Sequence, residues 1–470
     1  MKKTALLAVV LHLLIFAGSH AAITRDSVNI PLFGKVYTFT QTPTPKNIVV
    51  MISGDSGWRS SVSGYSETFA SMNSLVVGVD AYEYYKILKT RTEECYNFSA
   101  DFIQLITFIE KKYDFPDYVP PVLMGFAGGA TLVYAILIQS HQGNFIAGMS
   151  VGFCPEIDIQ KTPCDINGIS AKTAGQGKKY LLQPYEGLDI PWIVLNGKLD
   201  KVCSYASIQE FTSKINSAEL VELTKVGHSY SRSADFMPQW KDSYSKIISK
   251  YESEKPAQVS PDEVKDLPLI ITNSKFSDKK APLALLISGD GGWYGFEQQI
   301  ADNLALRGVP TIGLDSKKYF WHRRTPEQTA ADIAKALTFY GNQWGRNKYV
   351  IVGYSLGAEL VPFIINRLPK DVKSKVQSSA LLSPATSTDF EIHISNMLGM
   401  GNRQNTYNTT DEIIKMKNVR TLLIFGEGEK TELPELLAGT KAVIRKIPGD
   451  HHYKFNLPLI MQTMTENNIF

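Results

Sequence analysis

The sequence predicts two tandem α/β domains, each built on a mostly parallel sheet with helices on both faces. Three observations support this fold class. The chain has 470 residues, which is too long for one ordinary domain and sufficient for two. Its sequence repeats in the same order along the two halves. Short apolar runs alternate with stretches of helical spacing, which is typical of parallel strands joined by crossover helices.

The internal repeat is clearest in a seven-residue segment. Residues 52–58, Ile-Ser-Gly-Asp-Ser-Gly-Trp, return at 287–293 as Ile-Ser-Gly-Asp-Gly-Gly-Trp. Further matched pairs follow in order: 78–80 with 313–315, 124–130 with 352–358, 192–200 with 421–429, and 226–228 with 449–452. Because both order and approximate spacing are kept, we predict a duplicated domain.

A polar, proline-containing stretch at 251–261 separates the copies and has the composition of a linker. We therefore predict a first domain over 24–250, a linker over 251–267 and a second domain over 268–470. Each domain then has a usual size.

The first residues are typical of a secretory signal peptide, which we predict over 1–21. Lys2 and Lys3 precede an apolar run at 5–17, and a small-residue pattern follows at 19–21. The run is shorter than the roughly 20 residues that span a bilayer. We therefore expect cleavage and export rather than an N-terminal anchor.

The composition, with 20% charged and 44% hydrophobic residues, is that of a globular protein. The 49 basic and 46 acidic residues are scattered without a basic stripe, so nucleic acid is not an expected partner. We also expect neither a metal nor a cofactor.

All four cysteines lie in the first half, and an even number in an exported chain permits two disulfides. Three pairings are possible. Cys154 and Cys164 flank a short loop-like stretch and form the favoured pair, which leaves Cys95 with Cys203. The alternative is four buried thiols.

In the second copy, apolar runs predict buried strands, and stretches with helical spacing lie between them. A Thr-Pro-Glu sequence opens the longer predicted helix. The predicted strands are 283–287, 311–314, 349–352, 379–382 and 421–425, and the predicted helices include 296–306 and 325–340.

Residues 353–357, Gly-Tyr-Ser-Leu-Gly, follow one of these strands and precede a helix-like segment. A sharp strand-turn-helix elbow lifts the serine hydroxyl above the sheet and frees the next amide to bind an oxyanion. This context predicts Ser355 as a nucleophile and the Leu356 amide as one oxyanion donor. The predicted fold is therefore of the α/β-hydrolase type.

A serine nucleophile needs a base and an orienting acid, which follow it in this chain order. Glu429 follows the strand at 421–425 and matches an acid of the first copy, while Glu427 is the alternative. His452 is the preferred base because the alignment places it opposite the histidine of the first copy. A shift by one residue would choose His451 instead.

The loop at 289–293, Gly-Asp-Gly-Gly-Trp, follows the first strand of the domain and offers the second oxyanion donor. Gly291 and Gly292 are the candidates, because glycine lets the backbone approach a substrate closely. The alternative is a tight turn with Trp293 packed in the core.

The first copy lacks the nucleophile. Ala127 stands where the second copy has its serine, although Asp200 and His228 remain. A methyl group cannot attack a carbonyl. We therefore interpret residues 24–250 as an inactive copy that serves binding, docking or the shaping of the active site's entrance.

With these motifs, the chain resembles the bacterial virulence protein family VirJ, specifically its long two-copy members. The resemblance covers both halves, and its most distinctive parts are 289–293, 319–332, 353–357 and 448–452. It implies a periplasmic protein of Gram-negative bacteria, linked to virulence and to type IV secretion. Long members are similar to hydrolases that remove the lysyl group from lysyl-phosphatidylglycerol.

The resemblance thus implies an aminoacylated phospholipid at the periplasmic face of the inner membrane as partner, with secretion-system proteins as further partners. Acids near the site would favour a cationic lysyl group; Asp290, Asp315, Glu359 and Asp450 are the candidates. Two alternatives remain: a non-catalytic adaptor or chaperone for secretion substrates, and a hydrolase of a soluble ester or peptide. An adaptor would not need the serine, histidine and acid to converge.

Overall fold

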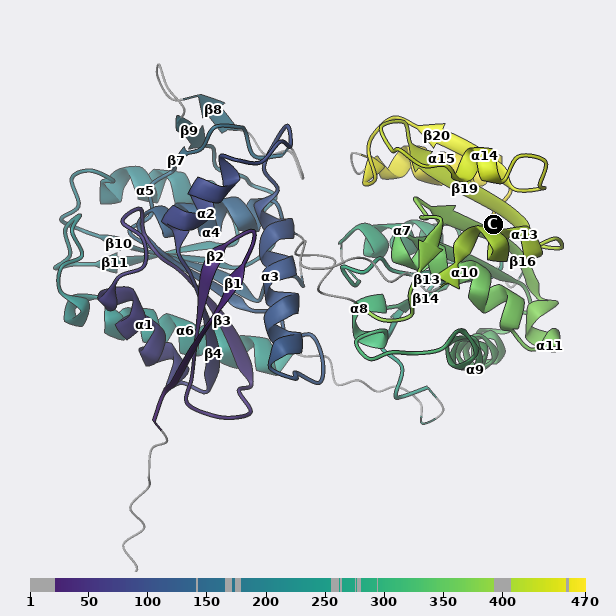
Figure 1. The fold of residues 1–470 in the computed structure, drawn as a ribbon, viewed down its shortest axis with the longest axis horizontal. Coiled ribbons are helices and arrows are strands. Elements are labelled where there is room, and N and C mark those ends of the chain that lie inside the picture. The colour runs from purple at the N-terminus through teal and green to yellow at the C-terminus, as the bar shows by residue number, and fades with distance from the viewer. Residues whose placement is uncertain are drawn as a thin grey trace, which may run out of the picture.

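The computed structural model shows two α/β lobes side by side (Figure 1). The structure describes residues 22–140, 143–164, 171–173, 179–254, 262, 264–274, 276, 280–293, 295–392, 407–453 and 456–470. The predicted signal peptide at 1–21 lies outside these residues.

The first lobe is built on an eight-stranded sheet with the order β1-β2-β4-β3-β5-β6-β10-β11. The pairs β1/β2 and β2/β4 are antiparallel, and the other neighbours are parallel. A small antiparallel sheet, β7-β9-β8, is inserted between β6 and β10. The strands are β1 (Thr24–Ile30), β2 (Gly34–Thr40), β3 (Asn47–Ile52), β4 (Ser74–Val79), β5 (Val122–Phe126), β6 (Ala147–Val151), β7 (Glu156–Asp158), β8 (Ala171–Thr173), β9 (Lys179–Leu182), β10 (Trp192–Gly197) and β11 (Ala218–Leu223).

The second lobe repeats this plan with the order β12-β14-β13-β15-β16-β19-β20, in which only β12/β14 is antiparallel. The five predicted strands are confirmed as β13, β14, β15, β16 and β19. The strands are β12 (Leu269–Thr272), β13 (Leu283–Ile287), β14 (Thr311–Leu314), β15 (Tyr349–Tyr354), β16 (Val376–Leu382), β19 (Arg420–Gly426), β20 (Val443–Ile447) and the short pair β17 (Ser387–Thr388) and β18 (Tyr407–Asn408).

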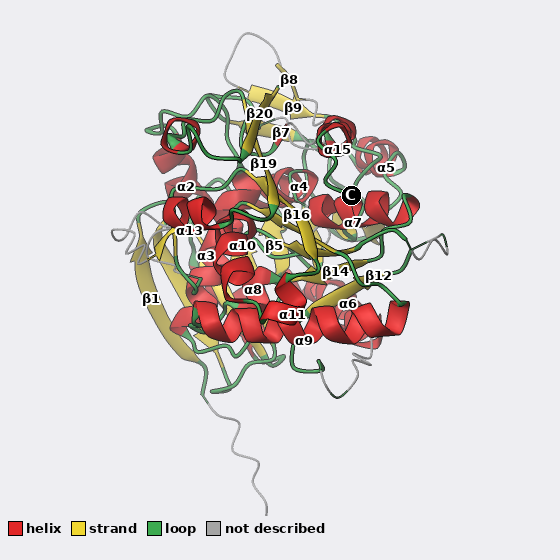
Figure 2. Ribbon diagram, turned by 90° about the vertical axis from the view of Figure 1, so that its right-hand side faces the viewer, coloured by secondary structure: helices red, strands yellow, loops and turns green. Residues whose placement is uncertain are grey.

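Helices cover both faces of each sheet, which confirms the predicted fold class; α9 and α15, for example, lie on opposite sides of the second sheet (Figure 2). No helix among the described residues is long and apolar enough to cross a membrane. In the first lobe, one face carries α2 (Ala81–Leu88), α3 (Phe98–Lys112), α4 (Gly128–Ile138) and α5 (Tyr205–Thr212), and the other α1 (Ser60–Ala70) and α6 (Met237–Glu254). In the second lobe, one face carries α8 (Ser316–Tyr319), α9 (Pro326–Trp344), α10 (Leu356–Arg367), α11 (Lys370–Lys373), α13 (Thr409–Lys415) and α14 (Leu433–Leu436), and the other α7 (Gly295–Leu306) and α15 (Leu457–Glu466).

The segment expected as a linker, 251–267, carries structure at both of its ends. The last turn of α6 extends to residue 254. Val264 and Leu267 are buried in the core of the second lobe. Most residues between them lie outside the described part of the chain.

The tertiary structure explains why two separate segments, 52–58 and 78–80, recur together as 287–293 and 313–315. The ring of Trp58 lies over Gly78, where an added Cβ would be 2.2 Å from the ring, and Trp293 lies over Gly313 at 2.3 Å in the same way. The carboxylate of Asp80 also accepts a hydrogen bond of 3.0 Å from the Trp58 amide. Each Gly-Asp-x-Gly-Trp loop is therefore held by the neighbouring strand, which needs a glycine and an aspartate at fixed positions.

The predicted disulfide pairing is wrong. The bonds join Cys95 to Cys164 and Cys154 to Cys203. The Cys164 amide donates to the carbonyl of Tyr96, which brings this loop beside Cys95. Cys154 follows β6 and Cys203 follows β10, and these strands are neighbours in the sheet. Nearness in sequence misled the prediction, because strand order decides which loops meet. Disulfides persist in oxidising compartments, so the pairs indicate folding outside the cytoplasm.

Peptide mapping under non-reducing conditions is expected to recover one peptide that links Cys95 with Cys164 and another that links Cys154 with Cys203. Replacing Cys95 and Cys164 together with serine should lower the free energy of unfolding by about 2–5 kcal/mol, as is usual for a lost native disulfide. Urea unfolding of the variant measures this loss. A linked peptide that joins Cys154 with Cys164 would contradict the observed pairing.

Candidate active site

Ser355 stands at a strained elbow between β15 and α10. Its backbone has φ 51° and ψ −119°, a conformation that L-residues rarely adopt. The flanking glycines are required by close contacts: a Cβ at Gly353 would lie 2.4 Å from the carbonyl group of Gly357, and one at Gly357 would lie 2.2 Å from the Ile287 carbonyl oxygen. The strand-turn-helix context expected from the motif is therefore present.

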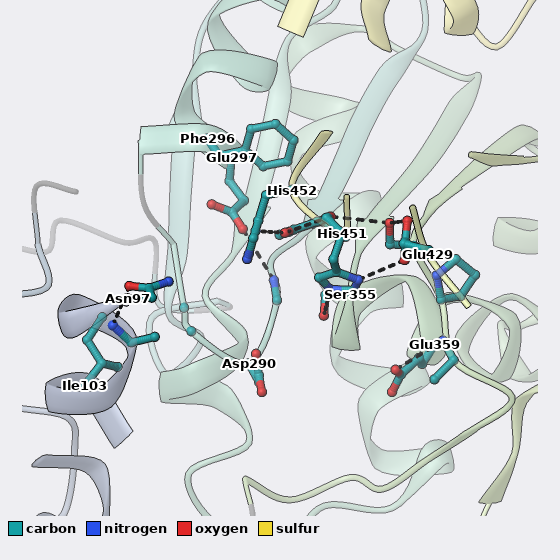
Figure 3. A pocket seen from close by; sticks show the side chains of 18 of the residues that line it. Asn97, Ile103, Asp290, Phe296, Glu297, Ser355, Glu359, Glu429, His451 and His452 are labelled. Carbon is teal, nitrogen blue, oxygen red and sulfur yellow. Dashed lines mark hydrogen bonds and ion pairs between the residues drawn. The ribbon is translucent and has the colours of Figure 1, made fainter. Parts of the chain in front are cut away.

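The structure brings Ser355, His451 and Glu429 together in one hydrogen-bonded chain (Figure 3). The Nε2 atom of His451 lies 3.0 Å from Ser355 Oγ, and its Nδ1 atom lies 3.0 Å from Glu429 Oε2. Each distance is within hydrogen-bonding reach. The histidine is thus placed to accept the serine proton while the carboxylate orients the ring.

Two further groups hold the carboxylate of Glu429. Its Oε1 atom accepts hydrogen bonds of 2.6 Å from the hydroxyl of Ser383 and 2.6 Å from the amide of Gly426. Burial raises the pKa of Glu429, but the bonds from His451, Ser383 and Gly426 outweigh it and leave the pKa below its ordinary value. The carboxylate is therefore ionised at neutral pH.

Ser383 is a supporting residue that the sequence did not reveal. It follows β16 with φ 52°, and its hydroxyl lies 2.6 Å from that of Tyr453, which donates to the Ile424 carbonyl. No local motif marks Ser383, which directly follows β16, or Tyr453, which directly follows the two histidines.

Burial lowers the pKa of His451, but the hydrogen bond to Glu429 and the carboxylate's charge outweigh this effect and raise it above 6.5. The charges of Asp290 and Glu359 act in the same direction. His451 is therefore a stronger base than an ordinary histidine.

The preference for His452 over His451 is wrong. His452 Nδ1 lies 2.6 Å from the hydroxyl of Tyr354, and its amide donates to the side chain of Asp450. Burial and the neighbouring His451 lower the pKa of His452. The turn hydrogen bonds align the two copies: the Tyr230 amide donates to the Gly227 carbonyl, and the Tyr453 amide donates to the Asp450 carbonyl. Asp450 therefore takes the place of Gly227 and His451 that of His228, so the prediction was shifted by one residue.

Glu429 is the acid that meets the histidine, whereas the alternative, Glu427, is exposed. The amide of Glu427 is bonded to the Ile447 carbonyl in the turn after β19.

The predicted oxyanion loop lies against Ser355, because a Cβ at Gly289 would be 3.4 Å from the Cβ of Ser355. The Gly292 amide, however, donates to the Gly289 carbonyl at 3.1 Å and closes the turn, so it is not a free donor. Gly291 lines the cavity. Leu356 supplies the first amide of α10, and the first amides of a helix have no acceptor within the helix. These two amides remain the candidates.

The first copy preserves the geometry of this site without the serine. Ala127 has φ 50° and ψ −118°, the same elbow geometry as its counterpart Ser355. His228 Nδ1 lies 3.1 Å from Asp200 Oδ2. The acid, the histidine and the strained turn are thus retained around a methyl group.

A cavity of 1040 Å³ is lined by Ser355, His451 and Glu429. Both lobes line it: Asn97 and Ile103 reach it from the first, and Asp290, Glu297 and Glu359 from the second (Figure 3). This volume is just above the range for small-molecule sites, roughly 300–1,000 Å³.

Of the four acids expected near the mouth, Asp290 and Glu359 line the cavity. Asp315 instead accepts from the Lys318 amide and caps α8, and Asp450 accepts from the His452 amide. Glu297 and Glu432, which the sequence did not single out, also line the cavity.

No curated protein matches the sequence. Among solved structures, the chain is similar to one assigned as a dienelactone hydrolase from Klebsiella pneumoniae, with 12% identity, a TM-score of 0.35, and coverage of 48% of this chain and 99% of that chain. Est1E from Butyrivibrio proteoclasticus shows 13% identity, a TM-score of 0.33, and coverage of 48% and 99%. The esterase domain of a Rhodothermus marinus protein shows 13%, 0.31, and coverage of 47% and 97%.

A family model described as bacterial virulence protein (VirJ) matches residues 46–144 and 281–468. These ranges cover more than half of the 470 residues and include both elbows, the Gly-Asp-Gly-Gly-Trp loop, Glu429 and His451. The chain therefore belongs to the VirJ family of bacterial virulence proteins.

Proposed function

We propose that this protein is a serine esterase that acts outside the cytoplasm and cleaves an aminoacyl ester. The proposal rests on the hydrogen-bonded chain Ser355–His451–Glu429, which lines a large cavity. An adaptor without catalysis would need neither this convergence nor a base with a raised pKa.

In the proposed reaction, Ser355 Oγ attacks the ester carbonyl while His451 Nε2 takes the serine proton. The amides of Leu356 and Gly291 stabilise the oxyanion. His451 then gives its proton to the departing alcohol, and an acyl-enzyme remains. Water attacks this acyl-enzyme with His451 again as base. The bond to Ser355 Oγ then breaks, His451 returns its proton to that oxygen, and the free acid leaves. Glu429 stabilises the imidazolium in both steps.

We propose lysyl-phosphatidylglycerol as the substrate, because the VirJ resemblance implies it and the charges of the cavity suit it. The α-ammonium of an aminoacyl ester is bonded to the carbon next to the reacting carbonyl, so it must lie close to Ser355. Asp290 and Glu359 lie near the site, since both charges act on His451. A cation at this place is therefore attracted by both carboxylates.

The proposed location is the periplasm. The signal-peptide-like residues 1–21 and the two disulfides both suit export to an oxidising compartment. The proposed role in virulence comes from the family resemblance.

The test uses the mature protein and Ser355→Ala with lysyl-phosphatidylglycerol in detergent-phospholipid micelles, with released lysine as the readout. Wild-type protein should release lysine, and the variant should lose at least about 10⁴-fold in kcat/KM, as nucleophile removal does in serine hydrolases. Cells that carry the variant should accumulate the lysylated lipid. Lipid levels equal in both strains, together with no hydrolysis of this lipid or of p-nitrophenyl acetate, would contradict the proposal and favour the adaptor.

A further inference from the structure

One face of α3, in the inactive first lobe, is directed at the catalytic lobe (Figure 1). Most residues of this helix are buried in the first lobe. The partly exposed ones recur three or four residues apart, which places them on one helix face: Ala100, Ile103, Gln104, Phe108 and Lys111. The N-terminal members of this face, Ala100, Ile103 and Gln104, line the catalytic cavity.

The C-terminal end of the same face is anchored to the catalytic lobe. Lys111 donates a hydrogen bond from Nζ to the carbonyl oxygen of Trp321 and lies over its ring. The Trp321 side chain is 1% exposed and is buried in the core of the first lobe, where its indole N–H donates to the Phe115 carbonyl at 2.7 Å. A tryptophan of one lobe packed in the core of the other holds the two lobes in one arrangement.

A second contact between the lobes is made by Lys317, four residues before Trp321. The ammonium of Lys317 is 3.3 Å from the ring centroid of Tyr118, and Lys317 is 1% exposed. Burial of this kind strengthens a cation–π contact. The segment 317–321 therefore docks beside the end of α3 and fixes where its N-terminal half meets the cavity.

The two walls of the cavity differ in charge. The catalytic wall carries Asp290 and Glu359, whereas the wall from the first lobe carries uncharged side chains such as Ile103 and Gln104. In Figure 3, Ile103 lies on the side of the cavity away from Glu359, with Ser355 between them. The acyl and alcohol groups leave the ester carbonyl carbon in different directions, so an acyl group whose ammonium meets Glu359 directs its alcohol past Asp290 toward α3.

We propose that α3 of the inactive lobe binds the alcohol portion of the ester, and that the first lobe thereby selects esters of large alcohols. This inference rests on the proposed esterase function of Ser355. The active site is then incomplete without the inactive copy, whose retained role is substrate recognition.

The test compares lysine methyl ester with lysyl-phosphatidylglycerol, which share the acyl group and differ only in the alcohol. Ile103→Trp and Gln104→Trp each place a large ring at the α3 wall. We expect kcat/KM for the lipid ester to fall about tenfold or more, chiefly through KM, because a filled pocket discriminates by size. The value for the methyl ester should change by less than about twofold. Using two variants guards against misfolding of either, which thermal unfolding monitors.

Lys112→Trp is the matched control, because Lys112 is an exposed residue of the same helix that does not line the cavity. It should leave both substrates unaffected. Equal effects of the α3 variants on both esters, or no effect on either, would overturn the role of α3.

A failure of the substrate proposal gives a different pattern. Wild-type protein would then cleave neither lysyl ester but would cleave acetyl esters. Ethyl acetate and 1-naphthyl acetate differ only in the alcohol, so comparing them in the α3 variants tests the α3 wall in the same way. A protein that cleaves no ester at all would overturn both proposals.

Discussion

Replacing His451 with alanine is expected to lower kcat/KM by roughly 10⁴- to 10⁶-fold, the loss that follows removal of the base from a serine triad. His451 alone lies 3.0 Å from both Ser355 Oγ and Glu429 Oε2 among the described histidines. Steady-state hydrolysis of lysyl-phosphatidylglycerol, or of p-nitrophenyl acetate, measures the loss.

Two histidine variants serve as controls. His228→Ala removes the same type of acid-paired histidine from the first copy and should not change kcat/KM. His452→Ala breaks the bond to Tyr354, a residue of the elbow, and should cost no more than about 10²-fold, the size of an indirect positional effect. A larger loss for His452→Ala than for His451→Ala would restore the order expected from the sequence and contradict the geometry.

Replacing Glu429 with glutamine is expected to lower kcat by about 10³- to 10⁴-fold, because the amide neither stabilises the imidazolium nor holds the required tautomer. It should also move the pH profile. Catalysis needs neutral His451, so kcat/KM rises as pH increases through the pKa of this residue, which Glu429 holds above 6.5. Without the carboxylate, burial dominates and lowers this pKa, so the rising limb should move to lower pH.

Asp200→Asn makes the corresponding change in the first copy and should leave both the rate and the profile as they are. The pH dependence of kcat/KM over about pH 5 to 9 covers the expected titration of a histidine. A rising limb that stays in place in Glu429→Gln would mean that another group titrates.

The sequence by itself determined the fold class, the duplication and the place of Ser355 at the elbow. Strand and helix periods are local properties of the sequence. The elbow around Ser355 is a contiguous motif, and its glycines are required by close contacts with backbone a few residues away or on the adjacent strand. Glu429 could be found because the repeat aligned it with Asp200, and both acids do meet a histidine.

Only the tertiary structure decided which groups meet across long sequence distances. The choice of His451 over its neighbour depends on how the loop after β20 turns, and the cysteine pairs depend on the neighbouring positions of β6 and β10 in the sheet. The burial of Trp321 in the first lobe, and with it the position of α3 at the cavity, depends on the docking of two complete domains. Periodicity shows which face of an element is buried, but not which distant element covers it, because that is set by strand order and by loop paths.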